Sequence, residues 1–329
     1  MGIMSSHELW VLKGKQIMNI TPVVGAITRR GNLKELGEEL TFSIAISKSK
    51  KFPRNPCHLG DVVILKNKGK EITRMILVDE KNDGQSVSYS AFDYAFYLNK
   101  SDAIYQFNKL RADQCLRKIA SDFNVPVGNI VDIKVPYEKL HNGEVVSKIM
   151  KDILEHAEQK TGHKYLMEMR QGKLYIERQK DQVIIAKYQR RDNGFYSNAA
   201  LLISEPNKSR SVVDMVNTIQ IVGNDDKLKL TRADTAMQRK FGRLQKVVKL
   251  DQKETRSAQQ VAQAELKELS KITEEANVTL LGDDNVRAGR LIDIEDQMTG
   301  IKGRYLIESV DHSVTSGIHT MQLGLGART

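Results

Sequence analysis

A strand pattern that occurs twice constrains the fold of this chain more than any other sequence feature. Beginning at Gly60, an apolar run, a polar turn, a second apolar run, a glycine turn and a third strand-like run follow one another up to residue 92. The same order of features begins again at Gly289 and ends near residue 325. Short apolar runs joined by such turns are typical of antiparallel meanders. We therefore predict one small β-module folded twice; coincidence is the alternative, because short meanders look alike.

The segment before residue 93 contains only strand patterns. Its clearest strand covers residues 39–47, where apolar and polar residues alternate with the period of two that a half-buried strand requires. The alternating apolar residues are Leu40, Phe42, Ile44 and Ile46. Because no helical pattern separates these strands, an antiparallel barrel or sandwich is favoured. We expect a first tube-like antiparallel β-barrel over residues 1–98.

The middle of the chain changes to helical spacing. Two apolar stripes recur at steps of three and four residues, which indicates two amphipathic helices. The stripes are Ala112, Leu116, Ile119 and Phe123, and then Val146, Met150, Ile153 and Ala157. Two strand-like runs on either side of Gln171-Gly172 predict a hairpin. Residues 99–187 are therefore expected to form a small α/β domain inserted between β segments.

From residue 188 the chain returns to strand patterns, with one helical interruption at about 255–276. The helical stripe consists of Ala262, Leu266, Leu269, Ile272 and Ala276. We expect residues 188–329 to form a second tube-like β-barrel with this long helix packed on it. The fold class predicted for the whole chain is α+β and β-rich, with two tube-like antiparallel β-barrels and an inserted small α/β domain.

Motifs that carry chemistry are missing from the sequence. It contains no phosphate-binding glycine loop, no dinucleotide fingerprint, no serine elbow and no zinc-protease helix motif. His312 and His319 lie on either side of Gly317 and are expected to meet as a cross-strand surface pair; no third metal ligand is near in sequence. The acidic pair Asp283-Asp284 fits an Asx-type turn. We predict no enzyme, no catalytic residue, no cofactor and no metal site.

The charge of the chain leaves two kinds of partner open. Its net charge is +10, and the excess of Lys and Arg is concentrated in residues 227–253. Such a run fits nucleic acid or an acidic protein surface. Aromatic residues do not alternate with these bases, apart from Phe241, so a single-strand stacking platform is not supported. We favour an assembly face without specific nucleic-acid binding; a basic nucleic-acid-binding protein is the alternative. The candidate residues of this face are Arg239, Lys240, Arg243, Lys246 and Lys249.

Targeting signals are also missing. No basic segment followed by an apolar segment opens the sequence, and no apolar stretch reaches the ~18–20 residues of a membrane-spanning helix. We expect the protein to be made in the bacterial cytoplasm. Cys57 and Cys115 are then interpreted as thiols that fill structure rather than as a disulfide.

Two stretches resemble known phage tail proteins. Residues 89–130, from Tyr89-Ser90-Ala91-Phe92 to Val127-Gly128-Asn129-Ile130, resemble the strand-to-helix junction of XkdQ/YqbQ-type tail proteins from PBSX-like prophages. The C-terminal third resembles the closing domain of the late-control-protein-D hub family, which includes the core of type VI secretion spikes. The residues that carry this second resemblance include Gly242, Leu281-Gly282-Asp283, Arg287-Ala288-Gly289 and Gly303-Arg304-Tyr305.

The resemblance implies a non-catalytic baseplate hub of a contractile phage-type tail or a phage-tail-like bacteriocin. It implies a homotrimer that joins the tail tube protein to a central spike or LysM-type tail protein, with baseplate wedge proteins around it. Three copies of a chain with two similar barrels give six similar wedges, so a threefold assembly can match a sixfold tube. After synthesis, the protein is expected in the baseplate of a virion or tail-like particle.

Overall fold

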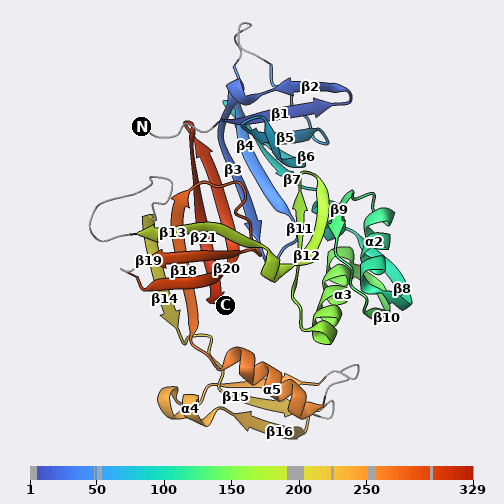
Figure 1. Cartoon of the computed structure of the whole chain (residues 1–329), viewed down its shortest axis with the longest axis vertical. Coiled ribbons are helices and arrows are strands. Elements are labelled where there is room, and N and C mark those ends of the chain that lie inside the picture. The colour runs from blue at the N-terminus through green and yellow to red at the C-terminus, as the bar shows by residue number, and fades with distance from the viewer. Residues whose placement is uncertain are drawn as a thin grey trace. The chain divides into compact units, whose positions relative to one another are not determined.

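The computed structural model describes residues 6–47, 49, 54–190, 204–223, 226–250, 257–296 and 299–328 (Figure 1). The chain divides into two compact units, which we call unit 1 (Met1–Asn207 with Asn277–Thr329) and unit 2 (Lys208–Ala276). Strands predominate and helices are fewer, so the α+β, β-rich class is confirmed. Among the described helices, none has the length and apolar character needed to cross a bilayer.

Unit 1 is built around one sheet of 13 strands. Its first half, which we call the first module, has the strand order β3-β4-β7-β6-β5-β1, with β2 paired to the outside of β1. The bounds are β1 (His7–Lys13), β2 (Gln16–Asn19), β3 (Val24–Asn32), β4 (Glu38–Ala45), β5 (Val62–Asn67), β6 (Lys70–Asn82) and β7 (Ser86–Phe92). A short 3-10 helix, η1 (Thr21–Val23), connects β2 to β3.

The second half of the sheet, the second module, repeats this strand order as β14-β18-β21-β20-β19-β13. The bounds are β13 (Val183–Arg190), β14 (Ser204–Ser211), β18 (Thr273–Leu281), β19 (Leu291–Asp296), β20 (Ile301–Thr315) and β21 (Ile318–Arg328). Taken in chain order, the six strands of one module occupy the same sheet positions as the six of the other. One orientation differs: β1 runs antiparallel to β5, whereas β13 runs parallel to β19.

The predicted meander is confirmed in both modules. Strands β5, β6 and β7 pair antiparallel in succession, as do β19, β20 and β21. The entry into each meander is also the same. Gly60 has φ +88° and donates its N–H to the carbonyl of Leu77 at 2.8 Å, while Gly289 has φ +87° and donates to Ile307 at 2.7 Å. The described strands form an open sheet order, so the two closed barrels stay a prediction.

Strand β20 joins the two modules because it is long enough to pair with two strands along one edge. Its residues 301–306 pair with β19, and its residues 309–314 pair antiparallel with β3 of the first module. Figure 1 shows β3 running beside β20 where the blue and red halves of the sheet meet. The sheet is therefore continuous from one module to the other.

The apolar pattern of β4 explains why the first module folds as it does. Every second residue of β4 is buried, and the predicted residues Leu40, Phe42 and Ile44 are at most 4% exposed. They pack in a core with residues such as Leu9 and Met75 from neighbouring strands. Burying an aliphatic or aromatic side chain of this size contributes about 1.5–3 kcal/mol, and the period of two places that contribution on one face of the sheet.

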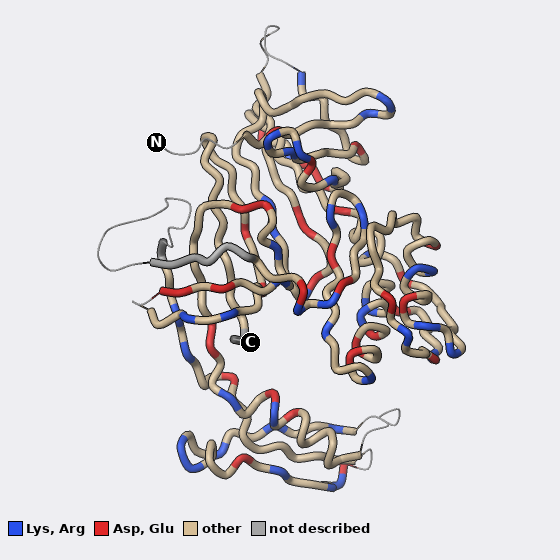
Figure 2. The backbone as a smooth tube through the Cα atoms, in the orientation of Figure 1, with Lys and Arg blue, Asp and Glu red and all other residues tan. Residues whose placement is uncertain are grey.

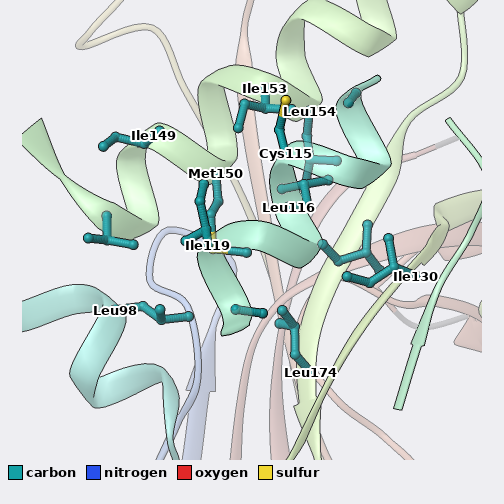
Figure 3. Close-up of a cluster of buried hydrophobic side chains, with 14 of the residues drawn as sticks. Leu98, Cys115, Leu116, Ile119, Ile130, Ile149, Met150, Ile153, Leu154 and Leu174 are labelled. Carbon is teal, nitrogen blue, oxygen red and sulfur yellow. The ribbon is translucent and has the colours of Figure 1, made fainter. Parts of the chain in front are cut away.

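The region between the modules is a mixed helical and strand structure with its own core (Figure 3). Both predicted helices are present, with Gly162 in the left-handed conformation after the second. The predicted hairpin turns at Gln171 and Gly172, whose positive φ angles of 50° and 71° suit a primed turn. The bounds are α1 (Ala95–Lys100), β8 (Asp102–Arg111), α2 (Ala112–Asp122), β9 (Val127–Ile130), β10 (Pro136–Val145), α3 (Val146–Thr161), β11 (Tyr165–Arg170), β12 (Lys173–Arg178) and η2 (Gln179–Asp181).

Within its described residues (208–223, 226–250 and 257–276), unit 2 contains a three-stranded sheet in the order β16-β15-β17 and two helices. Helix α5 packs its Val261 and Ala262 against Ile219 and Ile221 of the central strand. The bounds are β15 (Thr218–Val222), β16 (Leu228–Ala233), α4 (Thr235–Phe241), β17 (Gln245–Lys249) and α5 (Ala258–Leu269).

The prediction of a long helix over 255–276, packed on the second barrel, is wrong in extent and in contact. The helix ends at Leu269, packs on the sheet of unit 2, and is followed by β18 from Thr273; residues 255–256 lie outside the described residues. The Ser270 hydroxyl, at the C-cap, donates a hydrogen bond to Asp234 at 3.0 Å. Beyond it, Ala276 belongs to a strand with alternating burial, and its spacing from Leu269 and Ile272 imitates a helical stripe.

Candidate functional site

Unit 1 contains a group of ionisable side chains, four buried and one partly buried, where the two modules and the inserted region meet. We call it the junction cluster; its members are Arg29, Glu38, Asp93, Asp284 and Arg287. Arg29 lies on β3, Glu38 begins β4 and Asp93 follows β7, whereas the other two lie between β18 and β19. Buried charges persist only where partners compensate their lost hydration, so each contact here has a structural consequence.

Arg287 connects three segments of unit 1. Its Nη1 donates to Glu38 Oε2 at 2.6 Å and to the carbonyl of Met169 at 3.1 Å, and its Nη2 donates to the carbonyl of Ile72 at 3.2 Å. These partners belong to the first module and to β11 of the inserted region, while Arg287 itself belongs to the second module. One guanidinium therefore holds all three together, using the fork of donors that distinguishes arginine from lysine.

Glu38 also accepts hydrogen bonds from a second guanidinium, that of Arg29. Arg29 Nη1 donates to both Glu38 carboxylate oxygens at 3.3 Å, and both side chains are less than 10% exposed. Two buried cations thus share one buried carboxylate. Such an arrangement contributes little net stability compared with apolar packing, but it is strongly destabilised when one partner is removed.

Asp93 fixes the backbone at the start of β4. Its Oδ2 accepts from the Glu38 N–H at 2.8 Å and its Oδ1 accepts from the Ala95 N–H at 3.0 Å. Burial, together with the nearby Glu38 charge, raises the pKa of Asp93 to about 7. Gly37 has φ +95°, and a Cβ there would lie 2.4 Å from Asp93 Oδ1. Only glycine fits this position, because it supplies both the left-handed backbone and the space.

A second set of side chains, which we call the histidine cluster, adjoins the junction cluster through Asp284. It contains His7, His312 and His319 with Asp284. His7 Nε2 lies 3.0 Å from Asp284 Oδ1, and His312 Nδ1 lies 3.0 Å from His319 Nε2. The rings of His7 and His319 meet edge to face with centroids 4.6 Å apart.

The electrostatics of the histidine cluster follow from burial and from the charges beside it. Burial lowers the pKa of His319 to about 4 and that of His312 well below its ordinary value. Burial acts to raise the pKa of Asp284, but hydrogen bonds from His7 and Asn67 and the charge of Arg29 outweigh it, so this pKa is lowered. At neutral pH the cluster therefore holds one carboxylate with uncharged imidazoles at His312 and His319.

The structure corrects part of the sequence prediction for these residues. The expected meeting of His312 and His319 is confirmed, but they are not a surface pair, because His312 is only 2% exposed. The Asx turn is confirmed for Asp283, whose Oδ1 accepts from the Asn285 N–H at 2.9 Å. Asp284 instead joins the cluster. His7 is far away in sequence, so spacing alone gave no sign of it.

The five residues predicted as an assembly face all lie on unit 2 and are exposed. Arg239 and Lys240 end α4, Arg243 follows it, and Lys246 and Lys249 lie on β17. Figure 2 shows basic positions along β16, α4 and β17. Two of them are engaged within the unit: Lys246 Nζ contacts Glu265 at 2.9 Å, and Lys249 Nζ contacts Asp226 at 2.6 Å. Their role as an assembly face stays a prediction.

The fold is one found in solved phage tail proteins. It matches the 43 kDa tail protein of prophage MuSo2 from Shewanella oneidensis with a TM-score of 0.71 and 16% identity, over 98% of each chain. It also matches a tail protein from Neisseria meningitidis MC58 with a TM-score of 0.68 and 13% identity, over 98% of this chain and 97% of that one.

The chain belongs to the YQBQ-like family, which matches its residues 27–326. Its relatives include the phage-like element PBSX protein XkdQ of Bacillus subtilis strain 168, which is 27% identical over 270 residues, 80% of each chain. The resemblance of residues 89–130 to XkdQ/YqbQ-type tail proteins is thereby confirmed.

Proposed function

We propose that this chain is a non-catalytic structural hub in the baseplate of a contractile phage-type tail, and that it assembles as a homotrimer. The XkdQ relative belongs to a phage-like element and the matching solved structures are tail proteins, which supports this class of function. The observation that carries the proposal is the contact between β20 and β3, because it supplies a template for how one module binds the next.

In each module, the strand edge that corresponds to this contact lacks a partner among the described residues. By position in the sheet, β6 corresponds to β20 and β14 corresponds to β3. Within the described part of the chain, residues 79–82 of β6 pair with β7 on one side and with no strand on the other. Likewise β14 has β18 as its single described neighbour. These edges of β6 and β14 correspond to the edges through which β20 and β3 pair with each other inside the chain.

A second copy of the chain is the partner that fits these edges. If β14 of one copy pairs with β6 of the next, the new contact repeats the one between β3 and β20. Three copies then close a ring of six modules in which β6 and β14 also have a partner strand. In this pairing the exposed acids Asp79 and Glu80 on β6 would face a strand that carries Lys208 and Arg210. Within the chain both bases pair with Glu274, so they would be shared between Glu274 and the acids of the next copy. Pro206 removes one donor from β14, which restricts the pairing to the residues around it.

The remaining features of the proposed hub follow from this ring. The chain would be organised as a first tube-like barrel over residues 1–98, an α/β domain over 99–187 and a second tube-like barrel over 188–329, with the barrels completed in the assembly. One face of the ring would bind the tail tube protein and the other the central spike or LysM-type tail protein, with baseplate wedge proteins outside. The basic residues of unit 2 would contact an acidic tail partner. The protein would be made in the bacterial cytoplasm and carried in the particle.

The ring is tested by cross-linking between the two open edges. The Glu80→Cys and Ser209→Cys substitutions place one thiol on each edge, while the native Cys57 and Cys115 are buried. A short bismaleimide is expected to produce covalent dimers and trimers of the 37.2 kDa chain and no longer ladder. The matched control combines Glu80→Cys with Lys267→Cys on the exposed face of α5, and it should stay monomeric on a denaturing gel.

Two results would contradict the proposal. One is equal cross-linking of the test pair and the control pair, which would indicate random collision. The other is a single monomeric species for the test pair in assembled particles as well as in the purified protein. Particle images of the purified protein provide an independent measurement, in which a threefold ring is expected.

A further inference from the structure

We propose that His7, Asp284 and His319 form a binding site for a divalent transition-metal ion, with Zn²⁺ as the ion they suit best. One potential ligand atom from each residue lies within 4.8 Å of the other two. The residues come from β1, from the connection between β18 and β19, and from β21. This site is independent of the proposed function, because it lies inside one chain.

The ligand types match the proposed ion. Two imidazole nitrogens and one carboxylate oxygen are ligands that Zn²⁺ takes at about 2.0–2.2 Å, with a fourth position left for water. His7 Nε2 and Asp284 Oδ1 already lie 3.0 Å apart, which is close to the separation of two adjacent ligands of one ion. An ion between them would replace the proton that they now share. The His319 ring, in edge-to-face contact with His7, supplies the third ligand.

The hydrogen bonds from His319 to His312 and from His312 to Val286 fix the tautomer of His319 that a metal ligand needs. The carbonyl of Val286 can only accept, so His312 Nε2, which lies 2.9 Å away, carries the proton. His312 Nδ1 is then an acceptor and receives the N–H of His319 Nε2 at 3.0 Å. The Nδ1 of His319 consequently holds a lone pair. A metal-binding histidine usually donates its other ring N–H to a fixed acceptor in this way.

The carboxylate and the backbone around the site are similarly positioned. Asn67 Nδ2 donates to Asp284 Oδ2 at 2.7 Å, which orients the other oxygen toward His7. Gly282 gives the His319 ring its space, since a Cβ at Gly282 would lie 2.1 Å from the ring Cγ. The ligands therefore have supporting contacts of the kind that hold a metal site in shape before the ion arrives.

One neighbouring charge acts against the ion and limits its affinity. Arg29 Nη2 lies 3.8 Å from Asp284 Oδ1, and its positive charge repels a dication. Glu38 offsets part of that charge, because it accepts two hydrogen bonds from Arg29 Nη1. We therefore expect a dissociation constant on the order of 10⁻⁶ M rather than the much tighter binding of four-ligand structural zinc sites. The ion would join β1 of the first module to the second module.

The test uses the purified full chain after treatment with a chelator. Co²⁺ is titrated first, because its visible absorption reports ligand number and geometry, and Zn²⁺ is then added in competition. One ion per chain is expected, with the low-coordinate cobalt spectrum, and Zn²⁺ should raise the melting temperature by several degrees. His319→Gln, His7→Gln and Asp284→Asn should each weaken binding at least tenfold, with circular dichroism used to show that the variant is folded.

The matched control is His58→Gln. His58 is an exposed histidine whose Nδ1 lies 3.8 Å from Asp61 Oδ2. It therefore reproduces the histidine–carboxylate pair of the site without the second imidazole. It should bind Co²⁺ and Zn²⁺ as the unaltered chain does. Wild-type protein that takes up no Co²⁺ would overturn the proposal without any variant. So would a folded His319→Gln protein that binds both ions as tightly as wild type, or loss of binding in the His58→Gln control alone.

Discussion

The two modules place corresponding strand positions in different surroundings. Leu77 on β6 and Ile307 on β20 receive equivalent backbone hydrogen bonds at the meander entry, and both are buried. Three residues further along, Glu80 is exposed whereas Val310 is 1% exposed. The difference is β3, which pairs with β20 at this point; among the described strands, no counterpart of β3 pairs with this part of β6. The two modules share an apolar pattern and have the same strand order. At corresponding positions, the residue is apolar where a further strand pairs with that edge and charged where the edge is exposed.

The largest expected effect is the difference in unfolding free energy between removing a buried contact and removing an exposed contact between the modules. Arg287→Met should lower the free energy of unfolding by about 3–5 kcal/mol, because it removes one of the two cations beside the buried Glu38. Arg30→Met is the control: Arg30 bonds to Asp311 across β3 and β20 at 2.9 Å, but both side chains are exposed. It should cost less than about 1 kcal/mol. Urea unfolding measures both, and equal losses would show that the junction cluster does not hold the modules together.

The next effect compares the two meander entries directly. Gly60 and Gly289 have nearly the same positive φ, so alanine at either site should cost about 1–2 kcal/mol in backbone strain. A Cβ at Gly60 has no heavy atom within 4 Å, whereas a Cβ at Gly289 lies 2.2 Å from Leu166 Cδ1. Gly289→Ala should therefore lose a further ~1–3 kcal/mol from overpacking. Thermal unfolding of the two single variants checks the difference; similar losses would mean that Leu166 moves aside freely.

A smaller effect depends on pH. Because the pKa of Asp93 is about 7 in the folded chain and about 4 when unfolded, the folded state keeps a proton that the unfolded state has lost between those values. This contribution to stability is complete below about pH 4 and disappears as the pH rises through about 7. The stability difference between wild type and Asp93→Asn should therefore shift against wild type from about pH 5 to about pH 8. A flat Asp93→Asn difference across this pH range would refute the assignment.

The smallest effect is expected on unit 2. Replacing Arg239, Arg243 and Lys246 together with alanine should leave the melting temperature of unit 1 unchanged and weaken binding to an acidic tail partner. Neither wild type nor the triple variant should shift duplex DNA in a gel at roughly 0.15 M salt. Binding by the wild type that falls steeply with salt and is lost in the variant would instead favour the nucleic-acid alternative.

Sequence periodicity predicted the elements whose buried face is made by residues close together in the sequence. The period of two predicted β4, and the steps of three and four predicted α2 and α3 with their buried faces. The end of α5 was predicted too late, because Ile272 and Ala276 continue a helical spacing while they belong to a turn and a strand. Periodicity alone does not distinguish these cases where a single strand follows a helix closely.

The buried clusters were not predicted, because their members meet only through tertiary structure. His7 lies on β1 and Asp284 lies in the connection between β18 and β19, and no spacing in the sequence anticipates their contact. One signal was present: Glu38 stands in phase with Leu40, Phe42 and Ile44, so the alternation of β4 already placed a carboxylate on the buried face. A charged residue in phase with an apolar face indicates a buried partner elsewhere in the chain.

The place where unit 2 enters the chain has a consequence for how such proteins diversify. The connection between β3 and β4 in the first module is the short loop 33–37, whereas the corresponding connection between β14 and β18 contains the three-stranded sheet and both described helices of unit 2. Lengthening a surface connection costs little, since closure entropy grows only with the logarithm of loop length. The sheet can therefore accept an inserted domain at this connection without a change in the strands on either side. A different domain could be placed at this connection while the strand order of the sheet stays the same.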